Sequence, residues 1–431
     1  MARILMTAVA TPGHVYPMLG IARHLIAQGH QVRVMTGALF RERAEAIGAK
    51  FVAFDPKVDF DYRYLEEHFP ERAALPPGNA QMALALKDFF AAPIPLLNQQ
   101  LRTVIAAEAT DLLMVENCFY GVLPLLQAEE RPPVIGIGVT PLSFSSEDSI
   151  FYGPRIPPAL LPRELRREQL VDDATRALID EVQQSFDAAM TQSGGRPLHQ
   201  PFSDALIGGC DRFLQLATPA LEYRRDDLPA GVRFIGPLRS APMQQPSEAL
   251  WDETDQRPLV IVSQGTLANV DLHQLIVPTL KALAQLPVRV LATTGGRSVD
   301  GLLDRLPDNA RVREFISFER WLPQAAVLIT NGGYGSINYA LDQGVPLIIA
   351  GTGEDKLEAA SRVVAAGCGI NLHTSNPDES QLRHAVQQIL TQPAYRQHAA
   401  WVQADYACHD ALAAIAEEVA AIAEEVAALT A

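Results

Sequence analysis

The residues best placed for chemistry lie in three glycine-containing loops in the second half of the chain. The loops are SQGT at 263–266, TTGG at 293–296 and TNGGYGS at 330–336, and each follows a short apolar run. Glycine lets a ligand approach the main chain, and successive N–H groups at a helix start bind anions. One such loop alone also fits a tight turn without a ligand. Three at the same edge of one sheet favour a phosphate site.

A histidine in the first half is suited to proton transfer. Of the ten histidines, only His14 lies in a loop rich in Gly and Pro directly after the first predicted strand. Imidazole titrates near the working pH, so a histidine is the usual group to accept a proton from an attacking hydroxyl. A loop histidine taken alone also fits an ordinary surface residue. Its place in PGHVYP favours a general base.

Alternating apolar runs and helical patterns are expected to hold these loops. A buried strand over 3–10 is followed by a helix ending at Gly29 and by a second strand in QVRVMTG. Such strand–helix–strand units build parallel sheets, and ligands bind at the carboxyl ends of their strands. GxGxxG after the first strand and GxxxxGK followed by Ser or Thr are both missing from the sequence, so the phosphate site is of another kind.

The pattern restarts after an aperiodic stretch rich in Pro, Gln, Ser and acidic residues. We therefore predict an α/β protein with two Rossmann-like domains. The predicted bounds are 1–238 for the first domain, 239–257 for a linker, 258–410 for the second domain and 411–431 for a closing helix. The closing helix carries an apolar stripe and is expected to pack on the protein, with the first domain as one candidate; its members are Ile415, Val419, Ile422 and Val426.

The composition of the 431 residues argues against several partners. The formal net charge is −15, which repels nucleic acid and anionic membranes. No run of eighteen apolar residues occurs, so no membrane span is expected, and the apolar start is too short for a signal peptide. We expect a cytoplasmic protein. The four cysteines show no metal-binding spacing and are interpreted as reduced structural thiols: Cys118, Cys210, Cys368 and Cys408.

Several of these stretches resemble the family 1 glycosyltransferases, the UDP-glycosyltransferases. TNGGYGSINYALDQGVPLIIAGTGEDK is similar to their donor-binding signature, VSQGT and PGHVYPMLGIARHL match at two other places, and FIGPL falls where the family's N-terminal domain ends. The resemblance covers nearly the whole chain and is closest to bacterial and fungal members that act on apolar natural products. It implies a GT-B fold, a nucleotide sugar held mainly by the second domain and an acceptor held mainly by the first. It also implies inversion at the anomeric carbon without a required metal.

The resemblance places the donor diphosphate on the glycine loops. The leaving group gains negative charge, which N–H donors at a helix N-terminus stabilise. Asn331 stands where the family has a phosphate-facing histidine, so its amide can donate a hydrogen bond but supplies no positive charge. The predicted diphosphate-binding residues are Gly265, Thr266, Thr294, Asn331, Gly332, Gly333, Gly335 and Ser336.

Base stacking is assigned by spacing to Phe315. WLPQ at 321–324 looks like the family's Trp-x-Pro-Gln motif, but it lies too close to Asn331. The family's spacing instead falls on FISF, where Phe315 would stack on the base and Ile316 would bind it through the backbone. Trp321 is then expected to be a packing residue. The literal match to WLPQ remains the alternative.

The resemblance assigns sugar recognition to the acidic residues at the end of the donor-binding signature. Asp355 corresponds to the acidic residue that grips the hexose hydroxyls, with Glu354 beside it. Lys356 stands where glutamine is usual, which leaves the identity of the sugar open. The alternative is three solvated charges that cap a helix.

The family pairs its base with an aspartate at the end of a later strand. In DLLMVEN that position is Glu116, which reaches one methylene further. Either the geometry adjusts to the longer side chain or another acid such as Asp148 assists; a plain surface charge is the alternative for Glu116. The apolar stretches at 89–97 and 144–158 fit either an acceptor pocket or ordinary core.

We therefore predict an inverting glycosyltransferase with no cofactor, which uses a UDP-sugar or TDP-sugar as co-substrate. His14 would deprotonate the hydroxyl of an apolar small molecule. Two alternatives stay open: a sugar-nucleotide epimerase on the same fold and a catalytically silent sugar-nucleotide binder. The departures at Asn331, Glu116 and Lys356 motivate the silent alternative.

Overall fold

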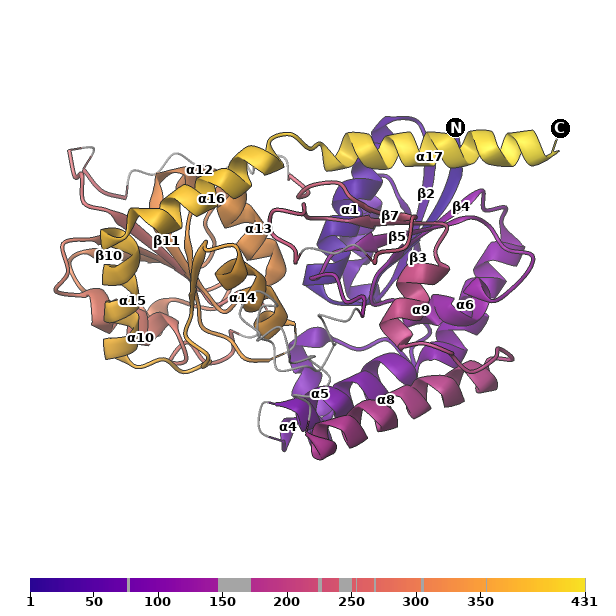
Figure 1. Ribbon diagram of the computed structural model, residues 1–431, viewed down its shortest axis with the longest axis horizontal. Coiled ribbons are helices and arrows are strands. Elements are labelled where there is room, and N and C mark those ends of the chain that lie inside the picture. The colour runs from indigo at the N-terminus through magenta and orange to yellow at the C-terminus, as the bar shows by residue number, and fades with distance from the viewer. Residues whose placement is uncertain are drawn as a thin grey trace. The chain divides into compact units, whose positions relative to one another are not determined.

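The computed structural model describes the chain except for residues 76–77, 146–171, 224–226, 240–249, 253, 267–268, 304–305, 354 and 431, and except for the side chains of 301, 303 and 426–430. The chain divides into two compact units. The first unit contains Met1–Leu216, Arg224–Leu238 and Asp410–Ala431, and the second contains Ala217–Tyr223 and Arg239–His409. Each unit is an α/β structure built on its own parallel sheet (Figure 1).

The described part of the first unit holds a seven-stranded sheet in the order β3-β2-β1-β4-β5-β6-β7, with every neighbouring pair parallel. The strands are β1 (Arg3–Thr7), β2 (Gln31–Thr36), β3 (Lys50–Ala53), β4 (Leu112–Glu116), β5 (Val134–Gly138), β6 (Arg212–Gln215) and β7 (Val232–Phe234). The central strands β1, β4 and β5 are mostly apolar because helices cover both faces of a parallel sheet. Register pairs Thr7 of β1 with Val115 of β4, so these two strands end together.

Helices of several lengths surround this sheet. The longer ones are α1 (Pro12–Ala27), α6 (Ile94–Ala107), α8 (Asp173–Gln192) and α17 (Ala411–Thr430). The shorter ones are η1 (Ala38–Phe40), α2 (Arg41–Ala46), η2 (Tyr62–Tyr64), α3 (Leu65–His68), α4 (Pro70–Ala73), α5 (Asn79–Ala85), η3 (Leu86–Ala91), η4 (Tyr120–Val122), α7 (Leu123–Leu126) and α9 (Phe202–Gly209). The terminal helix α17 packs against α1 (Figure 1).

The described part of the second unit holds a six-stranded sheet in the order β10-β9-β8-β11-β12-β13, again with parallel neighbours. Its strands are β8 (Leu259–Ser263), β9 (Arg289–Thr293), β10 (Ala310–Arg313), β11 (Ala325–Thr330), β12 (Leu347–Ile349) and β13 (Gly369–Asn371). Its helices are α10 (Ile276–Leu283), α11 (Asp300–Leu303), α12 (Phe318–Trp321), η7 (Leu322–Gln324), α13 (Tyr334–Asp342), α14 (Lys356–Ala365), α15 (Glu379–Thr391) and α16 (Pro393–Tyr406).

The two units are not contiguous in sequence. Ala217–Tyr223, which the sequence analysis assigned to the first domain, belongs to the second unit. An ion pair explains this difference, because Glu222 of the segment lies 2.7 Å from Arg362 of α14. At the other end of the chain, Ile415, Val419 and Ile422 of α17 are buried in the core of the first unit. The side chain of Val426 lies outside the described residues.

One helical stretch of the first unit is long and apolar enough to cross a membrane, judged by length and composition alone. The stretch is Asn79–Ala107, which comprises α5, η3 and α6. Asn98, in its last helix, is buried and donates to the carbonyl oxygen of Gly121, and Arg102 bonds to Asn98. These polar contacts are typical of a helix packed on protein, where buried polar groups find partners. The absence of a membrane span stays a prediction.

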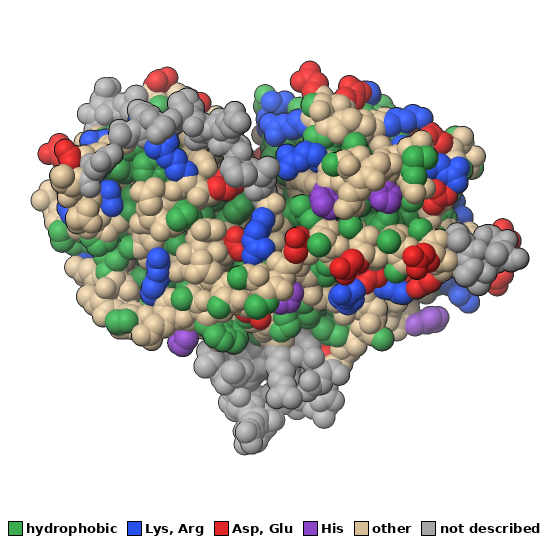
Figure 2. Space-filling view, turned by 90° about the horizontal axis from the view of Figure 1, so that it is seen from above, with side chains coloured by type: hydrophobic (Ala, Val, Ile, Leu, Met, Phe, Trp, Pro, Cys, Tyr) green, Lys and Arg blue, Asp and Glu red, His purple; other side chains and the backbone are tan. Residues whose placement is uncertain are grey.

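The surface carries both signs of charge. On the face shown in Figure 2, acidic and basic side chains are interspersed with apolar ones. The formal net charge of the whole chain is −15. The predicted absence of a nucleic-acid partner therefore rests on charge alone.

Candidate active site

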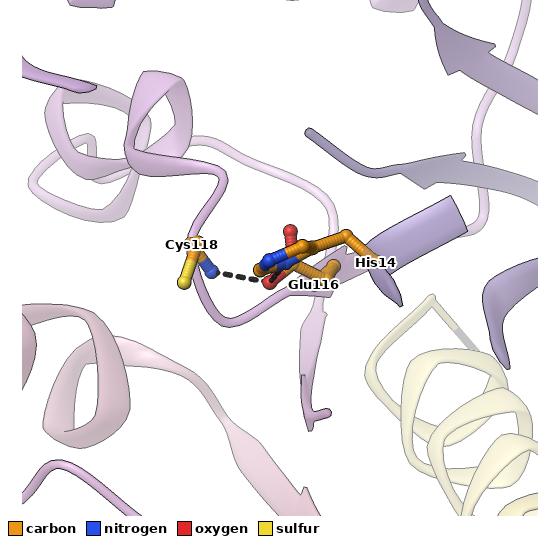
Figure 3. A group of neighbouring side chains, drawn as sticks. All are labelled: His14, Glu116 and Cys118. Atoms are coloured by element: carbon orange, nitrogen blue, oxygen red, sulfur yellow. Dashed lines mark hydrogen bonds and ion pairs between the residues drawn. The ribbon is translucent and has the colours of Figure 1, made fainter. Parts of the chain in front are cut away.

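A histidine and a glutamate meet at the carboxyl edge of the first sheet. Nδ1 of His14 lies 2.7 Å from Oε1 of Glu116 (Figure 3). Glu116 is the last residue of β4, and His14 lies in the first turn of α1, directly after the loop that follows β1. The adjacent ends of β1 and β4 therefore bring together two residues that are 102 positions apart in the sequence.

His14 belongs to a helix rather than to the predicted loop. The strand β1 ends at Thr7, earlier than the predicted end at residue 10, and α1 already begins at Pro12. Proline suits the first position of a helix, because its missing N–H would have no partner there and its φ is already helical. The helical turn fixes the direction of the imidazole more firmly than a loop would.

The carboxylate of Glu116 is held from both sides. Its side chain is completely buried, Oε1 accepts a hydrogen bond from the backbone N–H of Cys118 at 2.7 Å, and Oε2 accepts one from the N–H of Val9 at 3.3 Å. These donors compensate for the lost hydration of the carboxylate. Glu116 thus reaches His14 directly, so the longer side chain is accommodated by geometry. Asp148, the suggested assisting acid, lies outside the described residues.

The pairing sets the chemistry that the imidazole can perform. Nδ1 is in ion-pair contact with the carboxylate, which leaves Nε2 as the ring nitrogen that can take up a proton. A buried carboxylate at this distance also stabilises the positive charge that the ring gains on protonation. The arrangement can therefore act as a general base.

The three glycine loops of the second unit lie together, as predicted. They follow β8, β9 and β11, which are neighbours in the sheet. A Cβ added to Gly265 would lie 3.2 Å from Nδ2 of Asn331, and one added to Gly295 would lie 2.3 Å from the carbonyl oxygen of Gly265. Asn269 ties the second loop in place by donating to the carbonyl oxygen of Thr294 at 2.8 Å. The loops form one continuous surface of main chain.

The third loop opens onto a helix start. Gly333 precedes α13 as its N-cap, and Gly335 and Ser336 lie in the first turn. The first N–H groups of a helix have no acceptor within the helix. A Cβ added to Gly335 would meet nothing within 4 Å. This helix start is therefore accessible to an anion, which fits the predicted diphosphate site.

Asn331 is engaged within the protein. Its Nδ2 donates to the carbonyl oxygen of Gln264 at 2.5 Å, and its Oδ1 accepts from the N–H of Gly333 at 3.4 Å. The side chain is buried and joins the first glycine loop to the third. This tie was not expected from the sequence, which suggested only a donor facing phosphate. The phosphate-facing role stays a prediction.

The two aromatic candidates for base stacking differ in exposure. Phe315 is 57% exposed, whereas Trp321 is 8% exposed and packs edge-on against Trp251. Phe315 lies over the second glycine loop, since a Cβ added to Gly296 would lie 2.7 Å from its ring. Packing of Trp321 is confirmed. Stacking by Phe315 and base binding by the half-buried Ile316 stay predictions.

The acidic end of the donor signature is only partly described, because Glu354 lies outside the described residues. Asp355 precedes α14 without capping it through its side chain, and Lys356 is only 6% exposed. Lys356 is therefore not a solvated charge, whereas the half-buried Asp355 stays open between the two interpretations. The stem of Lys356 lies under the third glycine loop: a Cβ added to Gly332 would lie 3.4 Å from its Cβ, and one added to Gly351 would lie 2.9 Å from its Cδ.

A buried ion cluster behind this loop was missed by the sequence analysis. Arg362 of α14 pairs with Glu222 at 2.7 Å and with Glu358 at 2.9 Å, and its guanidinium stacks on Tyr223. Burial opposes the charge of Arg362, but the two carboxylates outweigh that effect and hold its pKa above the ordinary value. Arg362 and Glu222 lie 140 positions apart in the sequence. No local sequence pattern indicates that either residue takes part in a buried ion pair.

The aromatic stretch at 89–97 lies at the margin of the first core. Phe90 and Leu97 are half-buried and pack against the core, and Phe89 contacts Phe60 with ring centroids 4.6 Å apart. The stretch therefore contributes to the core. Most of the other stretch, 144–158, lies outside the described residues.

Comparisons with known proteins agree with this architecture. Residues 4–110 match the glycosyltransferase family 28 N-terminal domain, and residues 278–422 match the C-terminal domain described as erythromycin biosynthesis protein CIII-like. The structure resembles the glycosyltransferase of kitacinnamycin with a TM-score of 0.72, 22% identity and coverage of 98% of this chain and 100% of the other. It resembles the calicheamicin glycosyltransferase CalG4 with a TM-score of 0.70, 20% identity and coverage of 99% and 100%. The fold is GT-B, and the protein is a glycosyltransferase.

Sequence similarity shows to which family of glycosyltransferases the chain belongs. The chain is 34% identical to 4'-demethylrebeccamycin synthase of Lentzea aerocolonigenes, over 95% of this chain and 97% of that protein. It is 33% identical to UDP-glycosyltransferase 2 of Phaeomoniella chlamydospora, over 96% and 94%. The chain belongs to the family of natural-product glycosyltransferases. The predicted fold and enzyme class are confirmed, and transfer is favoured over epimerisation and over silent binding.

Proposed function

We propose that the protein transfers a hexose from a UDP-sugar or TDP-sugar to a hydroxyl group of an apolar small molecule, with inversion at the anomeric carbon. The observation that carries this proposal is the 2.7 Å pair of His14 and the buried Glu116. The relatives named as UDP-glycosyltransferases support a UDP-sugar, and the fold neighbours solved with thymidine diphosphate support TDP. The half-buried aromatic residues Phe89 and Phe90 suit an apolar acceptor.

In the proposed reaction, Nε2 of His14 takes the proton of the acceptor hydroxyl while its oxygen forms a bond to C1 of the sugar. The bond from C1 to the diphosphate oxygen breaks in the same step, and the leaving group takes the electron pair. Glu116 stabilises the imidazolium that forms. One displacement at C1 inverts its configuration. No metal is needed for any of these transfers.

We propose that main-chain N–H groups and one positively charged side chain stabilise the negative charge on the leaving group. The N–H groups at the start of α13 point their partial positive charge at the site. Asn331 supplies no full charge, and Lys356 lies beneath the same loop with its stem against Gly332 and Gly351. We assign to Lys356 the positive charge that the family histidine supplies elsewhere. This assignment accounts for two departures from the family pattern together.

The test is an assay of the purified protein with UDP-sugars and TDP-sugars and a panel of phenolic, terpenoid and macrolide acceptors. Nucleotide release that depends on the acceptor is expected, with a product of inverted anomeric configuration by NMR. Activity is expected to persist in EDTA. Isomerised sugar nucleotide without an acceptor would instead favour an epimerase, and tight binding without turnover would favour a silent binder.

A further inference from the structure

A third side chain with metal-binding chemistry stands beside the proposed base. Single ligand atoms of His14, Glu116 and Cys118 all lie within 4.8 Å of one another. Figure 3 shows the three residues gathered at the turn that follows β4. We propose that they form a binding site for a soft divalent metal ion such as Zn²⁺ or Cd²⁺, and that its occupancy inhibits the enzyme. The inhibitory effect rests on the proposed role of His14.

The donor set suits such an ion. Zinc is bound by imidazole nitrogen, carboxylate oxygen and thiolate sulfur, and three protein ligands leave a fourth position open. Ligand atoms around a tetrahedral zinc ion lie about 3.5 Å apart, given its usual bond lengths. The three side chains therefore need to move by about 1 Å, a distance within reach of rotation about their side-chain bonds.

The sulfur atom is held next to the dyad by a defined turn. The backbone N–H of Cys118 binds Oε1 of Glu116, and Nδ2 of Asn117 lies 3.6 Å from the Cys118 sulfur. Asn117 is itself fixed, because its Nδ2 also donates to Oγ1 of Thr140 at 2.7 Å and its Oδ1 accepts from the N–H of Val139 at 2.9 Å. The turn thus presents the thiol and the carboxylate on the same side of the strand end.

The other three cysteines lack this setting. Burial in apolar surroundings raises the pKa of the Cys210 and Cys368 thiols to about 12, so neither gives a thiolate near neutral pH. Cys408 is exposed at the end of α16. Within the described part of the chain, the cluster at Cys118 is the one place where three such ligand side chains lie so close. Cys408 is therefore a suitable control thiol.

Metal binding at this site would disable the dyad. An ion bound between the imidazole and Glu116 replaces their direct contact, and its positive charge opposes protonation of the ring. The ring then no longer accepts the proton of an acceptor hydroxyl. Donor binding in the second unit uses none of the three residues and is expected to continue.

The experiment uses the full-length protein after removal of metals with EDTA and dialysis. Cd²⁺ alone is titrated while the ultraviolet thiolate-to-cadmium charge-transfer band is recorded. One ion per chain is expected to give the band in the wild type and in Cys408→Ser, and the band is expected to be lost in Cys118→Ser. His14→Ala is expected to weaken Cd²⁺ binding on the order of a hundredfold, because a ligand atom is lost. A band that persists in Cys118→Ser, or binding unaffected by His14→Ala, overturns the proposal.

A second readout measures inhibition of transfer by Zn²⁺. Wild type and Cys408→Ser are expected to be inhibited alike, whereas Cys118→Ser is expected to need on the order of a hundredfold more Zn²⁺ for the same fractional loss. Equal sensitivity of Cys118→Ser and wild type overturns the proposed inhibition. If His14→Ala keeps its transferase activity while the wild type binds Cd²⁺ through Cys118, the metal site stands and the proposed base fails. Circular dichroism of each variant checks its fold.

Discussion

The candidate sites of the two units are built from different parts of the polypeptide. The first unit uses side chains: an imidazole and a buried carboxylate lie 2.7 Å apart, and main-chain N–H groups hold the carboxylate. The second unit uses bare main chain, with Gly265, Gly295 and Gly332 at positive φ where the loops approach one another. A side-chain site tolerates a change of reach, as Glu116 shows, whereas the main-chain site has no room for an added methyl group at Gly295 or Gly332.

The largest expected effect is on the side-chain site. His14→Ala is expected to lower kcat by about 10²- to 10⁴-fold, because general-base catalysis contributes that much. Binding of the nucleoside diphosphate, measured by calorimetry, is expected to stay unchanged, since the proposed donor residues lie in the second unit. Activity within about tenfold of the wild type would mean that another group accepts the proton.

The main-chain site is tested by adding one carbon atom. Gly332 has φ +93°, and an added Cβ would lie 2.8 Å from Cγ2 of Ile349. Gly332→Ala is therefore expected to cost about 1–3 kcal/mol of unfolding free energy and to weaken nucleotide binding at least about tenfold. Gly335→Ala is the matched comparison, because an added Cβ there meets nothing within 4 Å.

Denaturant unfolding and nucleotide titration separate the two effects. Gly335→Ala is expected to unfold at the same denaturant concentration as the wild type or a higher one, since alanine favours a helix over glycine. Any loss of nucleotide binding in that variant then reports on the ligand alone. Equal stability of Gly332→Ala and Gly335→Ala would contradict the packing of the loops.

The next largest effects are expected at the exposed ring of Phe315 and at the packed ring of Trp321. Phe315→Ala is expected to weaken nucleotide binding roughly tenfold, in line with the free energy of stacking on a base, without loss of stability. Trp321→Ala is expected to lower the unfolding free energy by about 3 kcal/mol, because the buried indole packs on Trp251. If instead Trp321→Ala removes nucleotide binding from a stable protein, WLPQ is the base-stacking motif.

The smallest effect concerns the cation under the third glycine loop. Lys356→Met is expected to lower kcat about five- to tenfold, since a hydrogen bond to a charged group is lost. Adding Asn331→His in that background is expected to recover part of the loss, whereas Asn331→Ala is not. Steady-state kinetics of the wild type, Lys356→Met, Asn331→His and the double variant give the coupling. Additive effects would show that the two positions act independently.

Local patterns sufficed to predict much of the structure from the sequence. Alternating apolar runs and glycine stops mark the strands around His14 and Gly333, so the two parallel sheets and the meeting of the glycine loops could be predicted. The exact start of α1 could not, because TPG fits both a loop and a helix start at Pro12. The tie from Asn331 to the carbonyl oxygen of Gln264 depends on side-chain geometry between two loops, which spacing does not reveal.

Ion pairs between residues far apart in the chain could not be predicted from local sequence patterns. Glu222 lies in a short segment without periodicity, and its partner Arg362 lies on an amphipathic helix where a charged residue is unremarkable. The pairing depends on the chain returning to the second unit at Ala217–Tyr223. The same holds for Cys118, whose closeness to His14 follows from the pairing of β1 with β4 rather than from any cysteine spacing.

The division of each unit among separate pieces of chain limits how the enzyme can be re-engineered. A hybrid that exchanges donor specificity by joining two parent enzymes at residue 239 would leave Arg362 facing a foreign Glu222 and α1 covered by a foreign α17. Where the other parent has no carboxylate at position 222, the hybrid loses this buried ion pair, which costs about 3–5 kcal/mol and is enough to unfold many domains. Working chimaeras should therefore carry 217–223 with the transplanted second unit and keep 410–431 with the recipient.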